Sequence, residues 1–271
     1  METKKRVAIL GGGNIGLAIA NGLDNARLYS TDNIYITKRK IETLTEYEKR
    51  GFKLTSNNLE AVKNSEIVII AVQPKQLDVV SKEISEVIDI KKHIVISVVS
   101  GASVKDIKKA IGKDVQVVRA MPNTAIAIQE SMTCLASDTK TNGALKIAKK
   151  IFDSVGKTLI IDEDLMVPAT ALCACGIAFF LRAIRAASQG GIEIGFHSED
   201  ALLMAAQTAK GAASLLVDMK SHPESEVDKV TTPRGCTIVG LNQMEHNGFS
   251  SALIKGITTS AEKAAKLYTT D

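Results

Sequence analysis

The chain has 271 residues, of which 45% are hydrophobic and 24% charged, and its formal net charge is +4 at pH 7. This length and apolar content suffice for one large or two ordinary packed domains, which excludes a disordered chain. No run approaches about 18 apolar residues, and the first apolar run is too short for a signal sequence, so we expect a cytoplasmic protein without a membrane span. The positive charge is spread out and lacks interleaved aromatic residues, so we expect no nucleic-acid partner.

Cysteine and histidine residues are few and scattered. Cys173 and Cys175 are separated by one residue, a spacing that fits neither a zinc site nor a redox pair, and Cys134 and Cys236 lie far from them in the sequence. No histidine has a neighbouring set of ligand residues. We therefore expect no metal site, and we expect the thiols to be reduced and mostly buried.

The first twenty residues join a short apolar strand, a glycine turn and an amphipathic helix. Residues 6–10 lead directly into the turn Gly11-Gly12-Gly13-Asn14-Ile15-Gly16. In a dinucleotide site of this spacing, Gly11 allows the tight turn, Gly13 lets the backbone approach the pyrophosphate, and Gly16 permits close packing of helix on strand. The phosphates bind the free N–H groups at the helix start. A glycine turn without a ligand is the alternative, and the flanking strand and helix disfavour it.

Strand-like and helical segments alternate through the first 160 residues. The strands expected after the first are residues 34–37, 52–55, 67–72, 94–99, 115–120, 132–136 and 158–161, with helices such as 75–88 and 142–152 between them. This alternation predicts an α/β fold with a Rossmann-type, doubly wound, mainly parallel sheet.

After Asp162 the pattern changes to long Ala-rich helical stretches without a clear strand. The expected helices are residues 164–189, 198–219, 237–246 and 250–267, and Ser198 is the expected N-terminal cap of the second. We therefore predict a dinucleotide-binding domain at 1–161 and an all-α dimerisation and substrate domain at 162–271. Small residues from Ala201 to Ala213 let helices approach closely, and about 110 residues are few to cover these faces, so packing between subunits is favoured over an intramolecular bundle.

The end of the second strand bears on the choice of nicotinamide cofactor. An NAD site normally has Asp or Glu there, whereas this strand ends in Thr37-Lys38-Arg39-Lys40. A hydroxyl and several cations suit a 2′-phosphate, which Arg39 can bind through its planar fork. We expect NADPH to be preferred, with NADH as an alternative donor. The alternative is that these residues only form a solvated helix start.

A second polar loop, residues 230–237, contains three threonines, Pro233, Arg234 and Gly235 and opens onto a helical segment. Free N–H groups at a helix start, flanked by hydroxyl groups, form a ready carboxylate site. A capping turn in which Thr237 caps the helix would use the same residue types.

The chain resembles the pyrroline-5-carboxylate reductase family over essentially its whole length. The resemblance rests on six ordered motifs: the Gly11 to Gly16 turn, Ala71-Val72-Gln73-Pro74, residues 97–101, Met121-Pro122-Asn123-Thr124, Thr170-Ala171-Leu172-Cys173 and residues 231–237. It implies NAD(P)H-dependent reduction of the C=N bond of 1-pyrroline-5-carboxylate to L-proline, the last step of proline biosynthesis. It also implies a homodimer interlocked by its helical domains, which some members assemble into decamers.

The motifs and the resemblance together define the candidate site residues. Those for the cofactor are Gly11, Gly13, Asn14, Ile15, Gly16, Thr37, Lys38, Arg39, Asn58, Ala71, Val72, Gln73, Pro74, Met121, Pro122 and Asn123. By resemblance, Asn58 and residues 37–39 contact the adenosine ribose region, and residues 121–123 lie near the nicotinamide. Thr232, Gly235, Cys236 and Thr237 would hold the carboxylate of a small cyclic imino acid, and Thr237 is the candidate for a catalytic hydrogen bond to it.

Such a reaction needs few catalytic side chains. A protonated cyclic imine is already electrophilic, so positioning it against the nicotinamide and holding its carboxylate supply much of the catalysis. The sequence accordingly shows no Ser-His-Asp or Cys-His arrangement, and the proton donor is not assigned.

Three segments depart from the family pattern. Gln73 stands where Lys is usual, residues 173–179 read Cys-Ala-Cys-Gly-Ile-Ala-Phe instead of Cys-Gly-Ser-Gly-Pro-Ala-Tyr, and Arg234 replaces a glycine. Ile177 restores a backbone donor that the family's proline lacks. Two alternatives therefore stay open: a reductase of another cyclic imino acid, and an NADPH-binding sensor without turnover.

Overall fold

The computed structural model describes residues 5–138 and 143–268, which form two compact units. The first unit contains the described residues up to Cys175 together with those from Ser260 onward, and the second is Gly176–Thr259. This division differs from the predicted boundary near Asp162. The reason is packing, because Met166 and Ala169 are buried in one cluster with Met121 of the sheet.

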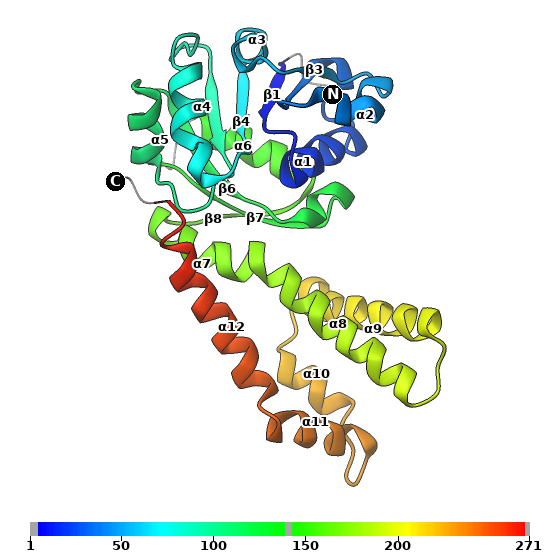
Figure 1. The fold of residues 1–271 in the computed structure, drawn as a ribbon. Helices are drawn as coiled ribbons and strands as arrows, with labels where there is room; N and C mark the ends of the chain where they lie inside the picture. The colour runs from blue at the N-terminus through cyan, green and yellow to red at the C-terminus, as the bar shows by residue number, and fades with distance from the viewer. Residues whose placement is uncertain (1–4, 139–142, 269–271) are drawn as a thin grey trace. The chain divides into compact units, whose positions relative to one another are not determined.

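An eight-stranded sheet runs through the described part of the first unit, in the order β3-β2-β1-β4-β5-β6-β7-β8 (Figure 1). Its strands are β1 (Val7–Leu10), β2 (Ile34–Thr37), β3 (Lys53–Thr55), β4 (Ile67–Ile70), β5 (Ile94–Ser97), β6 (Gln116–Met121), β7 (Ser131–Ala136) and β8 (Gly156–Ile160). Every neighbouring pair is parallel except β6 and β7. The predicted α/β fold with a doubly wound, mainly parallel sheet is confirmed.

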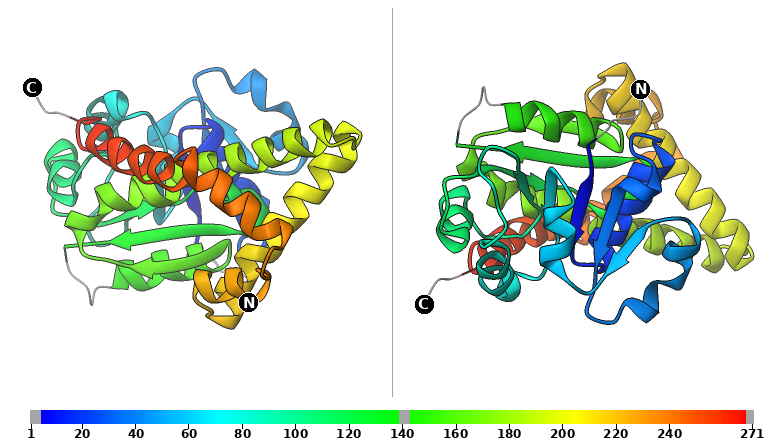
Figure 2. Two further views of the ribbon diagram at one scale, coloured as in Figure 1. Left: turned by 90° about the horizontal axis from the view of Figure 1, so that it is seen from below. Right: turned by 90° about the horizontal axis from the view of Figure 1, so that it is seen from above.

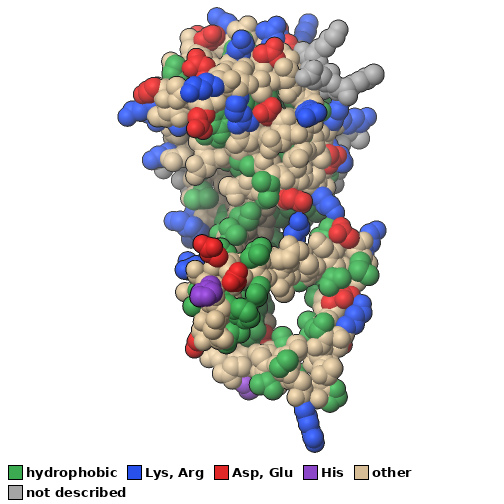
Figure 3. All heavy atoms as spheres, turned by 90° about the vertical axis from the view of Figure 1, so that its right-hand side faces the viewer, with side chains coloured by type: hydrophobic (Ala, Val, Ile, Leu, Met, Phe, Trp, Pro, Cys, Tyr) green, Lys and Arg blue, Asp and Glu red, His purple; other side chains and the backbone are tan. Residues whose placement is uncertain are grey.

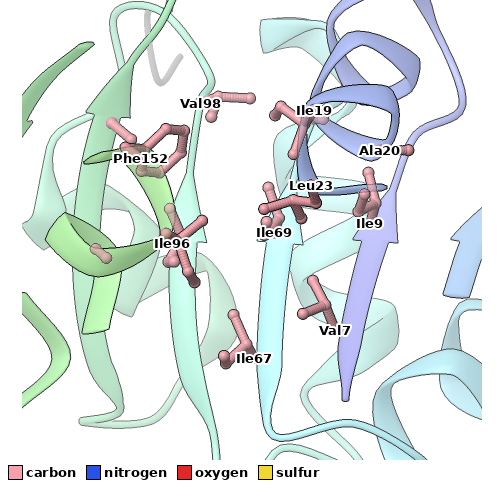
Figure 4. Packing of buried hydrophobic residues seen from close by; sticks show 14 of the residues in the cluster. Val7, Ile9, Ile19, Ala20, Leu23, Ile67, Ile69, Ile96, Val98 and Phe152 are labelled. Carbon is pink, nitrogen blue, oxygen red and sulfur yellow. The ribbon is translucent and has the colours of Figure 1, made fainter. Parts of the chain in front are cut away.

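Helices cover both faces of this sheet (Figures 1 and 2). On one face, α1 (Asn14–Asn25) and α6 (Gly143–Asp153) pack against alternate strand residues such as Val7 and Ile9. Figure 4 shows Ile19 and Leu23 of α1 and Phe152 of α6 in this layer. On the other face, α3 (Asn58–Lys63), α4 (Leu77–Ile84) and α5 (Val104–Ile111) cover the intervening strand residues. Because strand side chains alternate between faces, burial on both faces explains the continuous apolar strands.

The remaining helical elements of the first unit are short. They are η1 (Thr31–Asn33), η2 (Ile41–Leu44), α2 (Thr45–Lys49), η3 (Pro74–Gln76), η4 (Thr124–Ile128), η5 (Glu163–Leu165), α7 (Met166–Ala169) and a π-helical segment, η6 (Thr170–Cys175). The helix predicted for residues 75–88 is therefore shorter than expected and follows a 3-10 turn. The start predicted at Asn142 lies outside the described residues.

The second unit is helical in all of its ordered elements. These are the first part of α12 (Phe249–Ala264) and the whole of α8 (Gly176–Glu193), α9 (Ser198–Met219), α10 (Pro223–Lys229) and α11 (Cys236–His246). The predicted cap Ser198 is wrong by one position: His197 is the N-cap, and Ser198 begins the helix. A Cβ atom on Gly191 would lie 3.0 Å from the Cβ atom of Ala201. The small residues thus let α8 and α9 of one chain approach closely, and the packing of such faces between subunits stays a prediction.

Apolar side chains remain exposed on these helices in the single chain. Leu203 of α9 is 69% exposed, and Phe180 of α8 is 60% exposed. Figure 3 shows hydrophobic side chains gathered over the helical unit. In the described residues, one helical stretch, Glu163–Glu193, is long and apolar enough to cross a membrane, and an 18-residue window within it has a mean hydropathy of 1.9. A helix packed inside a soluble protein meets the same criterion, so its length and composition do not decide what covers this stretch.

Candidate cofactor and substrate site

A cavity of about 930 Å³ opens at the carboxyl ends of β1, β2 and β4. It is lined by Gly11, Gly12, Gly13, Thr37, Lys38, Arg39, Lys40, Thr43, Ser56, Asn58, Ala71, Val72, Gln73, Lys75, Gln76, Val79, Val80 and Glu83. In doubly wound sheets, ligands bind at this edge, where successive strands run to opposite sides of the first strand. Nine of the predicted cofactor residues meet in this cavity: Gly11, Gly13, Thr37, Lys38, Arg39, Asn58, Ala71, Val72 and Gln73.

The glycine turn has the geometry that its sequence predicts. Gly11 has φ +115°, and a Cβ atom there would collide with the carbonyl oxygen of Ala71. A Cβ atom on Gly16 would collide with the carbonyl oxygen of Gly11 and lie 3.3 Å from Ile9. Around Gly13, by contrast, no heavy atom lies within 4 Å of the Cβ position. Gly11 thus permits the tight turn, Gly16 permits close packing of the helix on the turn and on β1, and Gly13 leaves open space for a phosphate.

The start of α1 offers free backbone donors beside this space. Gly13 is the N-cap of α1, and it has no side chain that could accept from the N–H groups of Asn14, Ile15 and Gly16. The first turn of the helix also lacks acidic residues. Unsatisfied N–H groups and the positive end of the helix dipole favour an anion at this place. The local structure therefore fits a pyrophosphate.

Thr37 has a structural contact that the sequence did not reveal. Its hydroxyl oxygen accepts a hydrogen bond from the N–H of Gly11 (3.3 Å), and its carbonyl oxygen accepts one from the N–H of Gly12 (2.7 Å). The residue is only 4% exposed. Thr37 thus anchors the glycine turn to the end of β2, while Lys38 and Arg39 reach the cavity from the following positions.

The three cations after β2 are unpaired in the described part of the chain. Lys38, Arg39 and Lys40 line the cavity, and none of them forms an ion pair with a described residue. Arg39 and Lys40 are exposed, and Lys38 is half-buried. No described carboxylate therefore competes with an anionic ligand for these side chains.

The cavity also carries a carboxylate that sequence reasoning missed. The side-chain amide of Asn58 donates a hydrogen bond to Glu83 Oε2 (2.9 Å). Asn58 begins α3 and Glu83 lies near the end of α4, so the two approach only through the fold. Gln73, which stands where the family resemblance leads one to expect lysine, also lines the cavity, and its N–H donates to Gln76 Oε1 (3.3 Å). No sequence pattern pairs residues 25 positions apart, which explains why Glu83 was not a candidate.

The other predicted cofactor residues do not line the cavity. They are Asn14, Ile15, Gly16 and Pro74, which adjoin it in sequence, and Met121, Pro122 and Asn123. Met121 ends β6, and Pro122 and Asn123 follow it. The carboxyl end of β6 lies at the same edge of the sheet as those of β1 and β4. Asn123 donates a side-chain hydrogen bond to the carbonyl oxygen of Cys173 (3.3 Å), in the π-helical segment. The structure therefore places them at the predicted edge but outside the cavity.

The predicted carboxylate loop lies in the second unit. Gly235 is the N-cap of α11 and has no side chain to satisfy the N–H groups of Cys236 and Thr237. Thr237 is thus the second residue of the helix, and the alternative that it caps the helix is wrong. The N–H of Gly235 donates to the carbonyl oxygen of Thr232 (2.9 Å), which closes the turn. Arg234 adopts φ +60°, a conformation that favours glycine, so its backbone explains why glycine is usual there.

Metal-binding side chains do not cluster in the described residues: no three His, Cys, Asp or Glu side chains lie close enough together to hold an ion.

Comparison with known proteins ties the two units to one family. A family model described as pyrroline-5-carboxylate reductase dimerisation matches residues 163–267, and one described as NADP oxidoreductase coenzyme F420-dependent matches residues 6–101. Pyrroline-5-carboxylate reductase 2 of Dictyostelium discoideum is 48% identical over 98% of this chain and 94% of its own length. The chain belongs to the pyrroline-5-carboxylate reductase family.

Other relatives of the reductase family agree in sequence and fold. Pyrroline-5-carboxylate reductase 1 of D. discoideum is 55% identical over 97% of this chain, which spans half the length of that relative. A solved pyrroline-5-carboxylate reductase from Coxiella burnetii has a TM-score of 0.87 at 28% identity, covering 99% of this chain and all of that one. A Plasmodium falciparum pyrroline carboxylate reductase with NADP bound has a TM-score of 0.90 at 24% identity, covering 99% and 100%, and shares the fold.

Proposed function

We propose that this chain reduces the C=N bond of 1-pyrroline-5-carboxylate to give L-proline, using a nicotinamide dinucleotide. The observation that carries the proposal is the 48% identity with a pyrroline-5-carboxylate reductase across both units, at nearly full length in both proteins. The glycine turn and the open space at Gly13 support it, because they fit the cofactor that such a reduction requires. When bound, NAD(P)H supplies the hydride that reduces the imine carbon.

We infer that the cavity prefers NADPH to NADH. Lys38 and Arg39 line it without a described carboxylate partner, and the residue that ends β2 is Thr37 instead of an acid. A 2′-phosphate at this wall would gain charge-assisted hydrogen bonds from the two cations. The hydroxyl of Thr37 contributes indirectly, since it holds the turn at Gly11.

The start of α11 is our proposed site for the substrate carboxylate. The backbone N–H groups of Cys236 and Thr237 are free of a side-chain cap, and the hydroxyl of Thr237 has no partner among the described residues. These donors can hold and orient a carboxylate. Thr237 is then the residue that touches the substrate, and its hydroxyl is our candidate for a hydrogen bond to it.

An assay with a panel of cyclic imines tests the activity. The panel contains 1-pyrroline-5-carboxylate, its 2-carboxylate isomer and a six-membered cyclic imino acid, and the oxidation of NADPH is followed. We expect the highest kcat/KM with 1-pyrroline-5-carboxylate and proline as the product by mass spectrometry. Turnover of another imine alone would favour the second candidate, for which the Arg234 departure is the reason. NADPH binding without turnover of any imine would instead indicate a sensor.

We infer that the second unit forms a homodimer interface. The family model for dimerisation covers residues 163–267, and the large apolar side chains exposed in the single chain include Phe180, Leu181, Leu203, Met204, Val217, Met219, Val239 and Ile254 from the same span. Burial of such a surface against a second copy is the common solution for helices that lack partners. On this proposal the apolar stretch Glu163–Glu193 faces protein and not lipid. Assembly of dimers into a decamer stays a prediction.

A further inference from the structure

Two thiols from distant parts of the sequence meet beside β6. The Sγ atoms of Cys134 and Cys173 lie 3.9 Å apart, within hydrogen-bond distance for sulfur. Cys134 is in β7, where it pairs with Met121 of β6, and Cys173 is in the π-helical segment Thr170–Cys175. Both belong to the first compact unit. The spacing between Cys173 and Cys175, which fits no redox pair, therefore gave no sign of this partner.

The two thiols differ in their access to solvent. Cys134 is 4% exposed and packs with Met121 and Met166, whereas Cys173 is half-buried at the edge of the same cluster. A small oxidant can therefore reach Cys173 first, and the buried Cys134 thiol lies in contact with it. This arrangement of an accessible thiol and an adjacent resolving thiol is the one that reversible thiol oxidation needs.

Their protonation supports the same division of roles. The hydrogen bond from the Cys134 thiol lowers the pKa of Cys173 to about 7. The same bond, with burial, raises the pKa of Cys134 far above its ordinary value. Since the thiolate is the reactive form, Cys173 is the nucleophile of the pair and Cys134 holds its proton.

We propose that Cys134 and Cys173 are a modification site at which hydrogen peroxide forms a reversible intramolecular disulfide. The Cys173 sulfur attacks one peroxide oxygen and the O–O bond breaks, which leaves a sulfenic acid on Cys173. The departing hydroxide takes the proton of the Cys173 thiol and leaves as water. The Cys134 sulfur then attacks the sulfenic sulfur; the S–O bond breaks, and the oxygen leaves as a second water with the Cys134 proton. Two thiols are oxidised and one peroxide is reduced to two waters. A dithiol reductant restores both thiols by exchange.

The movement that this bond requires is small. Sulfur atoms in a disulfide are about 2.05 Å apart, so the two Sγ atoms must approach by about 1.9 Å. Cys173 lies in a π-helical turn, a geometry that is rare and locally irregular, and its carbonyl oxygen accepts the hydrogen bond from Asn123. The disulfide would therefore join β7 to the segment that contacts Asn123. The proposal concerns the thiol chemistry and does not depend on the proposed reaction.

Peptide mapping of the oxidised full chain tests the assignment. The protein is treated with hydrogen peroxide, remaining thiols are alkylated, and the digest is examined by mass spectrometry without reductant. We expect one cross-linked peptide pair joining Cys134 to Cys173, two hydrogen atoms lighter than the separate thiol peptides, which dithiothreitol releases. The Cys134→Ser variant should lose the cross-link and instead accumulate a sulfenic acid on Cys173 that dimedone traps.

A matched variant separates this pair from the neighbouring cysteine. Cys175→Ser changes a half-buried thiol two residues away and should leave the cross-link between Cys134 and Cys173 in place. Cys173→Ser changes a half-buried position and gives a second test if Cys134→Ser folds poorly. In this variant Cys134 should stay in the thiol form. A disulfide between Cys173 and Cys175 would overturn the proposal. So would oxidation of the exposed Cys236 while Cys134 and Cys173 both stay reduced.

Discussion

The cations after β2 offer the most direct test at the scale of single residues. Lys38 and Arg39 line the cavity and have no described ion-pair partner. We expect the double substitution Lys38→Ala and Arg39→Ala to raise the KM for NADPH far more than the KM for NADH. A charged hydrogen bond contributes about 1.5–3 kcal/mol, so losing one changes the KM by about tenfold to a hundredfold. Steady-state kinetics with both cofactors measures the effect.

Lys49→Ala is the matched control for these substitutions. Lys49 is an exposed lysine at the end of α2 and does not line the cavity. Its removal changes the net charge without removing a candidate phosphate contact, so we expect both KM values to stay within about twofold. Equal effects of the double substitution on NADPH and NADH would contradict a 2′-phosphate site at this wall.

Arg234 gives a second prediction at this scale. Its φ of +60° is unfavourable for a residue with a side chain, by about 1–2 kcal/mol. Substitution by glycine removes this strain, but part of the gain in stability is lost because glycine has more conformational freedom in the unfolded chain. We therefore expect Arg234→Gly to raise the free energy of unfolding by about 0.5–1 kcal/mol. Arg234→Ala removes the charge but keeps the strain, and it should show no such gain. Denaturant titrations of the three proteins make the comparison.

The same pair of variants tests the role of the charge. If Arg234 selects the imine, both variants should change the relative kcat/KM values across the imine panel in the same direction. If it is a solvated loop residue, the order of the imines should be the same in all three proteins. The stability measurement thus reports the effect of the backbone conformation of Arg234, and the specificity measurement reports the effect of its charged side chain.

At the scale of elements, the glycine turn distinguishes packing from ligand binding. A Cβ atom on Gly16 would collide with the carbonyl oxygen of Gly11, whereas one on Gly13 would meet no heavy atom within 4 Å. We expect Gly16→Ala to lower the free energy of unfolding by about 1–3 kcal/mol because the turn must shift. Thermal unfolding in the absence of cofactor should show this loss clearly.

Gly13→Ala is the counterpart of this substitution. It should leave the unfolding of the cofactor-free protein nearly unchanged, because its methyl group enters open space. It should nevertheless weaken NADPH binding, measured by calorimetry, since that space is the expected position of the pyrophosphate. Unchanged affinity in Gly13→Ala would mean that the phosphates bind elsewhere.

The elements that could be predicted from the sequence are those set by local patterns. The buried parallel strands appear as continuous apolar runs. The glycine turn is recognisable because only glycine fits at Gly11 and Gly16, where a Cβ atom would collide with the backbone. The π-helical segment Thr170–Cys175 and the short helix α10 lack such a signal. The bond between Asn58 and Glu83 and the contact between Cys134 and Cys173 depend on the fold, so no local pattern could reveal them.

At the scale of the whole molecule, the exposed apolar helices predict an obligate dimer. Leu203 is 69% exposed in the single chain, so Leu203→Glu should not disturb the fold of its own subunit. It would place a charge in the proposed interface, which strongly disfavours association. We expect light scattering to show a dimer for the original protein and a smaller species or aggregates for the variant.

Ile128→Glu controls for the loss of an exposed apolar side chain. Ile128 is 71% exposed in η4 of the first unit, outside the span of the dimerisation model. This variant should remain dimeric. A stable, fully active monomer of the unsubstituted protein at low concentration would contradict the proposed interface.

The division of the chain into units was only partly accessible from composition. The change from alternating strands to Ala-rich helices near Asp162 is real, and the dimerisation model begins at residue 163. The compact units nevertheless divide at Gly176, because Met166 and Ala169 pack on the sheet. The end of the chain returns as well: the hydroxyl of Tyr268 donates to Asp78 of α4 (2.7 Å). Such returns leave no periodic signal in the sequence.

This return has a consequence for synthesis on the ribosome. The second unit, 84 residues from Gly176 to Thr259, must be translated before residues 260–268 can reach the first unit. At about 5–20 residues per second, that takes about 4–17 s. Throughout this interval Asp78 lacks Tyr268, and Gly101 lacks the backbone of Tyr268 that packs on it. Residues 260–268, which belong to the first unit, thus emerge only after the helices of the second unit.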